Sequence, residues 1–339
     1  MTGRERVMNA LNRQPVDRIP FSFWFHFLRD EHLVDGVKNP EMMEANFQGH
    51  KRYINQVRPD FVKIMTDGLF RYPGIEPEKI KKVADLADIP EVDGNDPWTR
   101  ANSEHASSVT ALSPDLCYFY NVFSPSMLLR LLIGEEMYFK LYHEDAQKFA
   151  ESLTVMGQGI AGMTKRVLHE SGVDGIYYCV QNPNIHLMSD QEYAKWIRPS
   201  DLITLDAANS ASDNNILHIC GYEGRRNHLE EWVGYPSKAV NWAVAVEGVS
   251  LAEGQEIFSD RAVMGGFGNT IKDVLYTGPK QQVEDRVESI VTDAGKTGFM
   301  VAADCALPFD INWQHLVWVR DKLKNCNKTS NVKQPSKNP

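Results

Sequence analysis

A histidine and a cysteine, with one residue between them, lie at the end of an apolar run in the stretch ILHICGYEG at residues 216–224. A second cysteine, Cys305, follows another apolar run in the stretch AADCALP. His218, Cys220 and Cys305 together offer one imidazole and two thiolates, a ligand set that leaves one position of a tetrahedral zinc ion open for catalysis. Buried cysteines are often inert core residues, but a second cysteine at another strand end favours a metal site.

Eight short apolar runs are separated by segments with helical periodicity, and we expect these runs to be parallel strands covered on both faces. They cover residues 19–27, 60–65, 116–123, 174–180, 214–220, 238–245, 262–268 and 297–304. Helical patterns cover residues 137–169, 189–210 and 278–295. This alternation predicts an α/β fold, a single (βα)₈ TIM barrel, in which the active site forms at the carboxyl ends of the strands. The loops that carry Cys220 and Cys305 would then open onto the same mouth.

One catalytic domain is predicted over residues 1–323. The segment 71–114 is rich in Pro, Asp and Glu, and we expect it to form an insertion or lid in the barrel. Residues 324–339 are polar and poor in apolar side chains, a composition typical of a disordered tail.

Polar side chains near the other strand ends are candidates for substrate binding, although some would simply cap loops. These candidates are His26, Asp67, Asn121, Gln181, Asn182, Asn241 and Asn269. Glu223 lies close to the His-x-Cys pair and is either a fourth metal ligand, a group that supports the ligands, or a solvated loop carboxylate. The remaining cysteines, Cys117, Cys179 and Cys326, are expected to be structural.

The overall composition excludes several classes of protein. A net charge of −9 over 339 residues argues against a general nucleic-acid surface, which needs clustered Lys and Arg. No apolar run approaches the roughly 18 residues that span a bilayer. The five scattered cysteines do not form a disulfide framework and favour a reducing compartment, which we expect to be the cytoplasm.

Four stretches carry a resemblance to a known family: RERVMNALNRQPVDRIP, HICG, GGFGNT and GFMVAADCALP. In this order they resemble the uroporphyrinogen decarboxylase superfamily, which implies a (βα)₈ barrel. The decarboxylases of that superfamily need no metal and bind porphyrinogen carboxylates with an arginine-rich segment after the first strand. The corresponding segment here, FWFHFLRDEH, contains only Arg29.

The pattern His-x-Cys followed much later by Cys resembles the other branch, the corrinoid-dependent methyltransferases that act on coenzyme M and related acceptors. This resemblance implies zinc on His218, Cys220 and Cys305, and methyl transfer between a small thiol or methylated substrate and a corrinoid (cobalamin). The sequence contains no recognisable cobalamin-binding module, so we expect the corrinoid to arrive on a separate partner protein.

Zinc would serve such a reaction because a free thiol has a pKa of about 8.5 and is mostly protonated at neutral pH. Coordination deprotonates the thiol and keeps it nucleophilic. The sequence leaves three alternatives open: a cobalt-independent zinc alkyl transfer to a thiol, a uroporphyrinogen-type decarboxylation, and a non-catalytic zinc-binding or corrinoid-binding role. It also leaves open the methyl donor, the acceptor and the direction of transfer.

Overall fold

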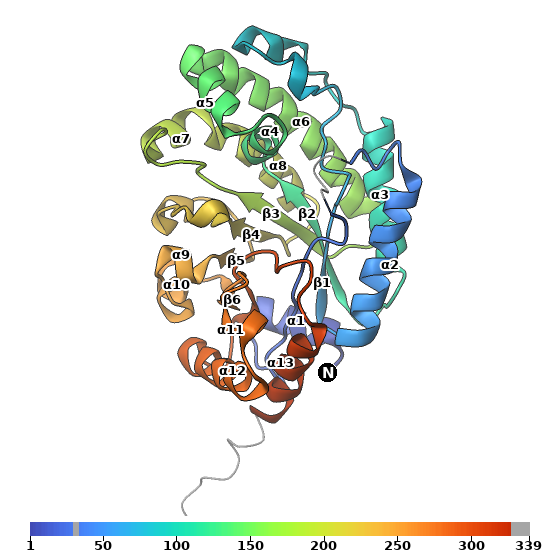
Figure 1. Ribbon diagram of the computed structural model, residues 1–339, viewed down its shortest axis with the longest axis vertical. Coiled ribbons are helices and arrows are strands. Elements are labelled where there is room, and N and C mark those ends of the chain that lie inside the picture. Colours follow the sequence, from blue (N-terminus) through green and yellow to red (C-terminus); the bar gives the residue numbers. More distant parts are fainter. Residues whose placement is uncertain (30–33, 327–339) are drawn as a thin grey trace, which may run out of the picture.

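The computed structural model describes residues 1–29 and 34–326, which form a curled parallel sheet surrounded by helices (Figure 1). The sheet has seven strands in the order β1 to β7, and each strand pairs in parallel with the next along the chain. The strands are β1 (Phe61–Ile64), β2 (Cys117–Phe123), β3 (Gly175–Val180), β4 (Ile216–Ile219), β5 (Ala239–Trp242), β6 (Ala262–Phe267) and β7 (Phe299–Ala303). Each of the seven lies within one of the predicted ranges.

Helices precede the sheet and connect its strands. Before the sheet come α1 (Gly3–Leu11) and α2 (Pro40–Val57). The connections contain α3 (Pro97–Thr110), α4 (Pro125–Ile133), α5 (Glu135–Glu144), α6 (Ala146–Glu170), α7 (Asp190–Trp196), α8 (Arg198–Asn209), α9 (Val244–Glu247), α10 (Leu251–Ile257), α11 (Val274–Thr277) and α12 (Lys280–Ala294). Between β4 and β5 the connection holds only the short 3₁₀ turns η3 (Tyr222–Gly224) and η4 (Leu229–Trp232), and α13 (Trp313–Cys326) follows β7.

The prediction of a closed eight-stranded barrel is wrong in one respect, because residues 19–27 do not form a strand. This segment makes a single bridge, from Phe21 to Val301 of β7, and at the other end of the sheet the Asp60 N–H, next to β1, donates to the Phe21 carbonyl at 3.0 Å. Distant side chains take the amides that a strand ladder would use: the Asp60 carboxylate accepts the Phe21 N–H at 3.1 Å, and the Tyr53 hydroxyl accepts the Phe23 N–H at 2.8 Å. Pro20 has no N–H to donate. The described residues therefore form a TIM-barrel-like sheet of seven strands.

The two faces of the sheet pack into different clusters, because successive side chains of a strand point to opposite faces. One face packs against the helices, with Val62 and Tyr178 among the buried residues. The other is the concave face, with Phe61, Tyr177 and Met264 in its core. His218, Cys220 and Cys305 lie at positions that continue this concave face, since Ile216, Cys220 and Cys305 all belong to its cluster.

The amino-terminal stretch closes the end of the sheet away from the carboxyl ends of the strands. Asp60, which precedes β1, accepts a hydrogen bond from Arg6 of α1 at 2.6 Å and another from Arg18 at 2.7 Å. Since Asp60 is almost fully buried, these two arginines supply the compensating charge that a buried carboxylate needs. Part of the RERVMNALNRQPVDRIP stretch is thus explained by structure rather than by chemistry.

The predicted helical patterns are present, but two of them are interrupted. Residues 137–169 are divided between α5 and α6 by Asp145, which caps α6 through its side chain. Residues 189–210 are divided between α7 and α8, and residues 278–295 contain α12 with Pro279 at its amino-terminal cap.

The segment 71–114, predicted as an insertion or lid, contains α3 and the 3₁₀ turns η1 (Pro77–Lys79) and η2 (Val83–Asp88). Of the predicted tail, residues 324–326 form the end of α13, and residues 327–339 lie outside the described residues.

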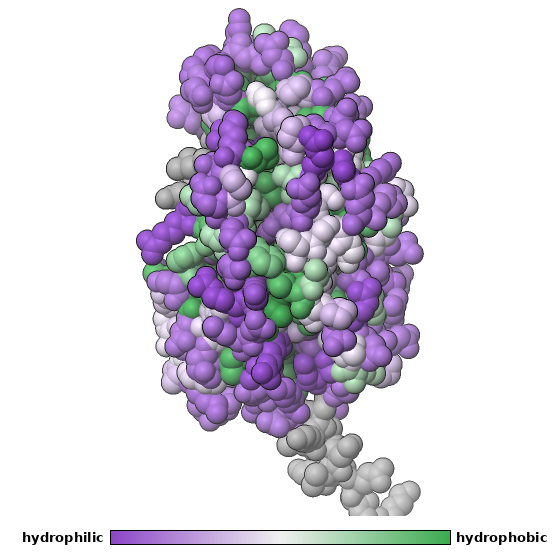
Figure 2. Space-filling view, turned by 90° about the vertical axis from the view of Figure 1, so that its right-hand side faces the viewer, coloured by the Kyte–Doolittle hydropathy of each residue, from purple (hydrophilic) through white to green (hydrophobic). Residues whose placement is uncertain are grey.

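Polar side chains cover most of the face seen from the right of Figure 1, with apolar residues visible near its centre (Figure 2). Within residues 1–29 and 34–326, no helix combines the length and the apolar character that crossing a bilayer requires. None of the five cysteines, all of which belong to the described part of the chain, forms a disulfide.

Candidate metal centre

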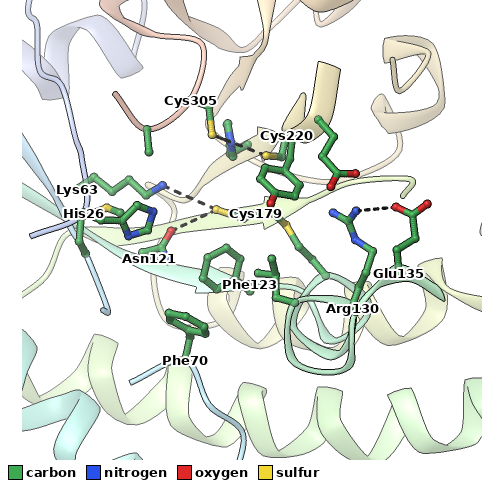
Figure 3. A pocket seen from close by; sticks show the side chains of 18 residues that line it. His26, Lys63, Phe70, Asn121, Phe123, Arg130, Glu135, Cys179, Cys220 and Cys305 are labelled. Carbon is green, nitrogen blue, oxygen red and sulfur yellow. Dashed lines mark hydrogen bonds and ion pairs between the residues drawn. The ribbon is translucent and has the colours of Figure 1, made fainter. Parts of the chain in front are cut away.

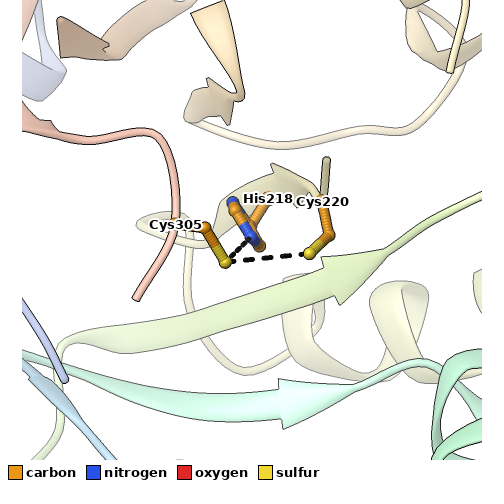
Figure 4. A group of neighbouring side chains, drawn as sticks. All are labelled: His218, Cys220 and Cys305. Carbon is orange, nitrogen blue, oxygen red and sulfur yellow. Dashed lines mark hydrogen bonds between the residues drawn. The ribbon is translucent and has the colours of Figure 1, made fainter. Parts of the chain in front are cut away.

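His218, Cys220 and Cys305 lie together at the carboxyl ends of the strands (Figure 4). His218 is in β4, and Cys220 is on the same face because it follows two residues later. Cys305 comes just after β7, and the curl of the sheet brings it back to β4. The loop with Cys305 is anchored by Asp304, whose N–H donates to the Phe267 carbonyl at 2.8 Å.

The distances between these side chains fit a zinc ion. Cys220 Sγ and Cys305 Sγ are 3.8 Å apart, and Cys305 Sγ is 3.6 Å from His218 Nε2. Tetrahedral zinc with its usual bond lengths holds two sulfurs about 3.8 Å apart and a sulfur and a nitrogen about 3.6 Å apart. All three ligand atoms lie within 4.8 Å of one another. One imidazole and two thiols therefore converge with the separations that a three-residue zinc site requires.

The orientation of the His218 ring is fixed by a hydrogen bond at Nδ1, the ring nitrogen that does not face Cys305. Asn241, in β5, donates its amide N–H to the Met264 carbonyl at 2.8 Å, which leaves its Oδ1 facing His218. His218 Nδ1 donates to that oxygen at 2.5 Å, and the Tyr177 hydroxyl donates to the same oxygen at 2.6 Å. With its proton on Nδ1, the neutral ring presents the lone pair of Nε2 to the cysteines, which is the tautomer that a metal ligand needs.

The two thiols of the site differ in acidity. The Cys220 thiol donates to Cys305 Sγ, and this contact, together with the charge of Lys63, holds the pKa of Cys305 well below its ordinary value. The same contact and burial raise the pKa of Cys220 well above its ordinary value. Cys305 therefore ionises first, and a cation between the three residues would stabilise the second thiolate as well.

A cavity of about 310 Å³ opens beside these three residues. Its apolar wall includes Met127 and Leu131 together with the rings of Phe70 and Phe123, and these two rings are labelled in Figure 3. A cavity of this size can hold a small organic molecule, and its apolar wall would keep water away from a reacting sulfur.

Three further predicted residues line this cavity: His26, Asn121 and Glu223. Asn121 donates to the Thr66 hydroxyl at 3.1 Å and accepts from the Cys179 thiol at 3.2 Å. Glu223 forms an ion pair with Arg225 at 3.1 Å, and among the described residues the metal-ligand group consists of His218, Cys220 and Cys305 without it.

Asp67, another predicted residue, lies behind His26 rather than in the cavity wall. Its Oδ1 is 2.8 Å from His26 Nδ1, and its Oδ2 accepts the Phe27 N–H at 2.7 Å. Burial alone would raise the pKa of Asp67, but His26 and the backbone N–H hold it below its ordinary value. Asp67 is thus an anionic support that orients the His26 ring.

The other predicted residues hold neighbouring loops. Gln181 accepts a hydrogen bond from Arg130 and donates to the Tyr222 carbonyl at 3.0 Å. Asn182 donates to the Met188 carbonyl at 3.1 Å. Asn269 donates to the Ala306 carbonyl at 3.2 Å, next to Cys305. None of these three lines the cavity described above, so their contacts support the loops around it.

The cavity wall also contains four ionisable residues that the sequence did not indicate as part of the site: Lys63, Arg130, Glu135 and Cys179. Cys179, expected to be purely structural, is buried but lines the cavity, because it pairs in register with His218 across β3 and β4. Burial raises the pKa of its thiol to about 11, so it is neutral at neutral pH. Arg130 and Arg225 both form ion pairs with Glu135, at 3.6 and 2.9 Å.

A TIM-barrel-like sheet with a histidine and two cysteines at its carboxyl edge defines an α/β protein with a candidate catalytic metal centre. A sequence profile of the family described as uroporphyrinogen decarboxylase (URO-D) matches residues 69–325. The chain belongs to this family.

Solved structures with the same fold include a methyltransferase from Methanosarcina mazei. It shares 14% sequence identity with a TM-score of 0.75, over 96% of this chain and 99% of that chain. A B12-independent methionine synthase from Shewanella sp. W3-18-1, in complex with selenomethionine, shares 11% identity with a TM-score of 0.57, over 93% of this chain and 100% of that chain. At these identities the likeness establishes the fold. No curated protein sequence matches the chain.

Proposed function

We propose that the protein is a zinc-dependent methyltransferase that moves a methyl group between a small thiol or methylated substrate and a corrinoid held by a separate protein. The convergence of His218 Nε2, Cys220 Sγ and Cys305 Sγ at zinc-ligand separations carries this proposal. The fold shared with a methyltransferase and a methionine synthase supports it.

The residues of the site have separate tasks in this reaction. His218, Cys220 and Cys305 would hold zinc, and the bound zinc would lower the pKa of a substrate thiol so that it reacts as a thiolate. Asn241 keeps the proton of His218 on Nδ1 and so directs Nε2 toward the site. The apolar wall with Phe70 and Phe123 shields the reacting sulfur from water.

Metal analysis and spectroscopy test this function. Purified protein should contain about one zinc per chain, as a single tetrahedral site requires. Cys220→Ser and Cys305→Ser should lose the metal, whereas Cys326→Ser, at the end of α13, should retain it. Adding a small thiol to the protein with methylcobalamin should produce the cob(I)alamin spectrum, and metal-free protein with full activity would refute the proposal.

A cobalt-independent alkyl transfer to a thiol is the second candidate, because one of the proteins with this fold is a B12-independent methionine synthase. It would use the same metal site and the same thiol. Methylation of the thiol by a cobalt-free methyl donor, with no reaction from methylcobalamin, would favour this candidate over the first.

A further inference from the structure

Lys63 is a buried cationic side chain in the cavity wall. It lies in β1 with only 5% of its surface exposed. Its Nζ is 3.9 Å from Cys179 Sγ, 4.1 Å from the centre of the Tyr177 ring and 5.2 Å from the centre of the Trp24 ring. Among residues 1–29 and 34–326, Lys63 forms no ion pair with a carboxylate, and the acidic residues nearest to it in sequence, Asp60 and Asp67, pair with Arg6 and His26. Buried charges in proteins are normally paired, so this arrangement calls for an explanation.

The immediate neighbours of the Lys63 ammonium group are uncharged, and the negative charge that it faces in the metal-free cavity is that of the Cys305 thiolate. The two aromatic rings attract a cation through their faces, which makes its burial tolerable. Cys179 is a neutral thiol that donates its proton to Asn121. The Tyr177 hydroxyl donates its proton to Asn241 Oδ1 at 2.6 Å and so offers no negative charge to Lys63.

A divalent metal at the site would take up that negative charge, and Lys63 lines the same cavity as Cys220 and Cys305 (Figure 3). Two thiolates and a neutral imidazole cancel the charge of a divalent metal ion. A neutral ligand at the open position would leave Lys63 unpaired. An anionic ligand there would add one negative charge, which the ammonium group would balance.

We propose that Lys63 is the counter-ion for an anionic ligand of the metal site, and that it makes this site selective for a sulfur ligand bound as a thiolate over a neutral ligand. Binding a thiol then releases its proton to the solvent and pairs the resulting thiolate with both the metal and Lys63. This inference rests on the proposed function only in requiring a divalent metal at His218, Cys220 and Cys305.

Cobalt(II) loaded in place of zinc provides a test, because its visible absorption reports the ligand at the open position. Wild type and Lys63→Met would each be titrated with 2-mercaptoethanol, which binds as a thiolate, and with imidazole, which binds as a neutral ligand. We expect Lys63→Met to weaken thiol binding about tenfold or more, the scale of one charge close to a partly buried anion. Imidazole binding should change by less than about twofold, because a neutral ligand gains little from the charge.

Two further variants separate charge from packing. Lys63→Gln also removes the charge and should repeat the selective loss of thiol binding. Lys165→Met makes the same chemical change on the exposed side of α6 and should leave both affinities unchanged. Replacing an unpaired buried charge by an apolar chain should not destabilise the metal-free fold, which thermal unfolding of Lys63→Met would check.

The outcomes distinguish this inference from the proposed function. If both Lys63 variants bind the thiol as tightly as wild type, or lose thiol and imidazole binding equally, the counter-ion role is refuted while the metal site stands. If wild type takes up no divalent metal, the counter-ion role and the proposed function both fail.

Discussion

Replacing Asn241 by alanine should weaken metal binding although Asn241 is not itself a ligand. Its Oδ1 accepts the Nδ1 proton of His218 at 2.5 Å, and its own amide is held by the Met264 carbonyl. In Asn241→Ala the imidazole loses the acceptor that fixes its tautomer and orientation. Part of its population would then carry the proton on Nε2, where it blocks coordination.

The expected loss of metal affinity in Asn241→Ala can be estimated from the contacts of His218. Loss of a hydrogen bond behind a metal-binding histidine costs about 10-fold to 100-fold in metal affinity, or about 1.4–2.8 kcal/mol. The Tyr177 hydroxyl lies 3.3 Å from His218 Nδ1 and can turn to accept its proton once Asn241 is gone. We therefore expect Asn241→Ala to fall near the tenfold end, and the double variant with Tyr177→Phe to approach a hundredfold loss.

Competition with a chromogenic chelator would measure these affinities on metal-free protein whose fold is checked by circular dichroism. Tyr177→Phe is the matched control, because it removes a hydroxyl donor to the same oxygen and leaves the contact between Asn241 and His218 intact. It should lose less than about threefold, since the metal-binding tautomer is preserved. Wild-type affinity in Asn241→Ala, or an equal loss in Tyr177→Phe alone, would show that Asn241 does not set the His218 tautomer.

Three further predictions concern the stability of the fold, each measured by urea unfolding. Burial raises the pKa of Asp201 to about 6 from an ordinary 3.8, so the native state binds more protons than the unfolded chain and stability falls as the pH rises from 4 to 7. Asp201→Asn should remove about 2–3 kcal/mol of this fall, and an unchanged pH dependence would contradict the assignment. Asp60→Asn should destabilise the protein by about 3 kcal/mol, because it leaves two arginines with less compensating charge; a loss below about 1 kcal/mol would indicate that solvent already screens them. Gly254→Ala would place a Cβ 2.0 Å from the Trp242 ring and should cost about 1–3 kcal/mol, whereas wild-type stability would mean that the helix can shift.

The seven strands were predictable because each is a short apolar run bounded by polar loops, and this pattern depends only on local sequence. Residues 19–27 carry the same pattern but form no strand. Their amides bond to Tyr53 and Asp60, which lie more than 25 residues farther along the chain, and such side-chain partners leave no local signal. Closure of a sheet depends on contacts of this kind.

The convergence of His218, Cys220 and Cys305 was predictable because their residue types stand at the ends of predicted strands, whereas the rest of the cavity depends on register. Lys63 and Cys179 lie inside apolar runs, and no motif in the sequence around them marks them as residues of a cavity. They reach the cavity because alternation places them on the concave face, and the pairing of Cys179 with His218 brings that thiol to the level of the site. Arg130 and Glu135 come from helices after β2, where no spacing predicts their role.

The arrangement of the three proposed metal ligands, His218, Cys220 and Cys305, depends on the curvature of the sheet. A strand can supply two ligands by itself only at alternate positions, and His218 and Cys220 satisfy this condition at the end of β4. The third ligand follows β7, which is separated from β4 by β5 and β6, so a flat sheet would hold Cys305 more than 10 Å away from them at the usual spacing of about 4.8 Å per strand. The observed 3.8 Å between the two sulfurs therefore requires the curl that the bridge from Phe21 to Val301 helps to maintain. A metal bound between these loops would in turn stabilise the curled form over any more open one, because it binds only where the three ligands meet.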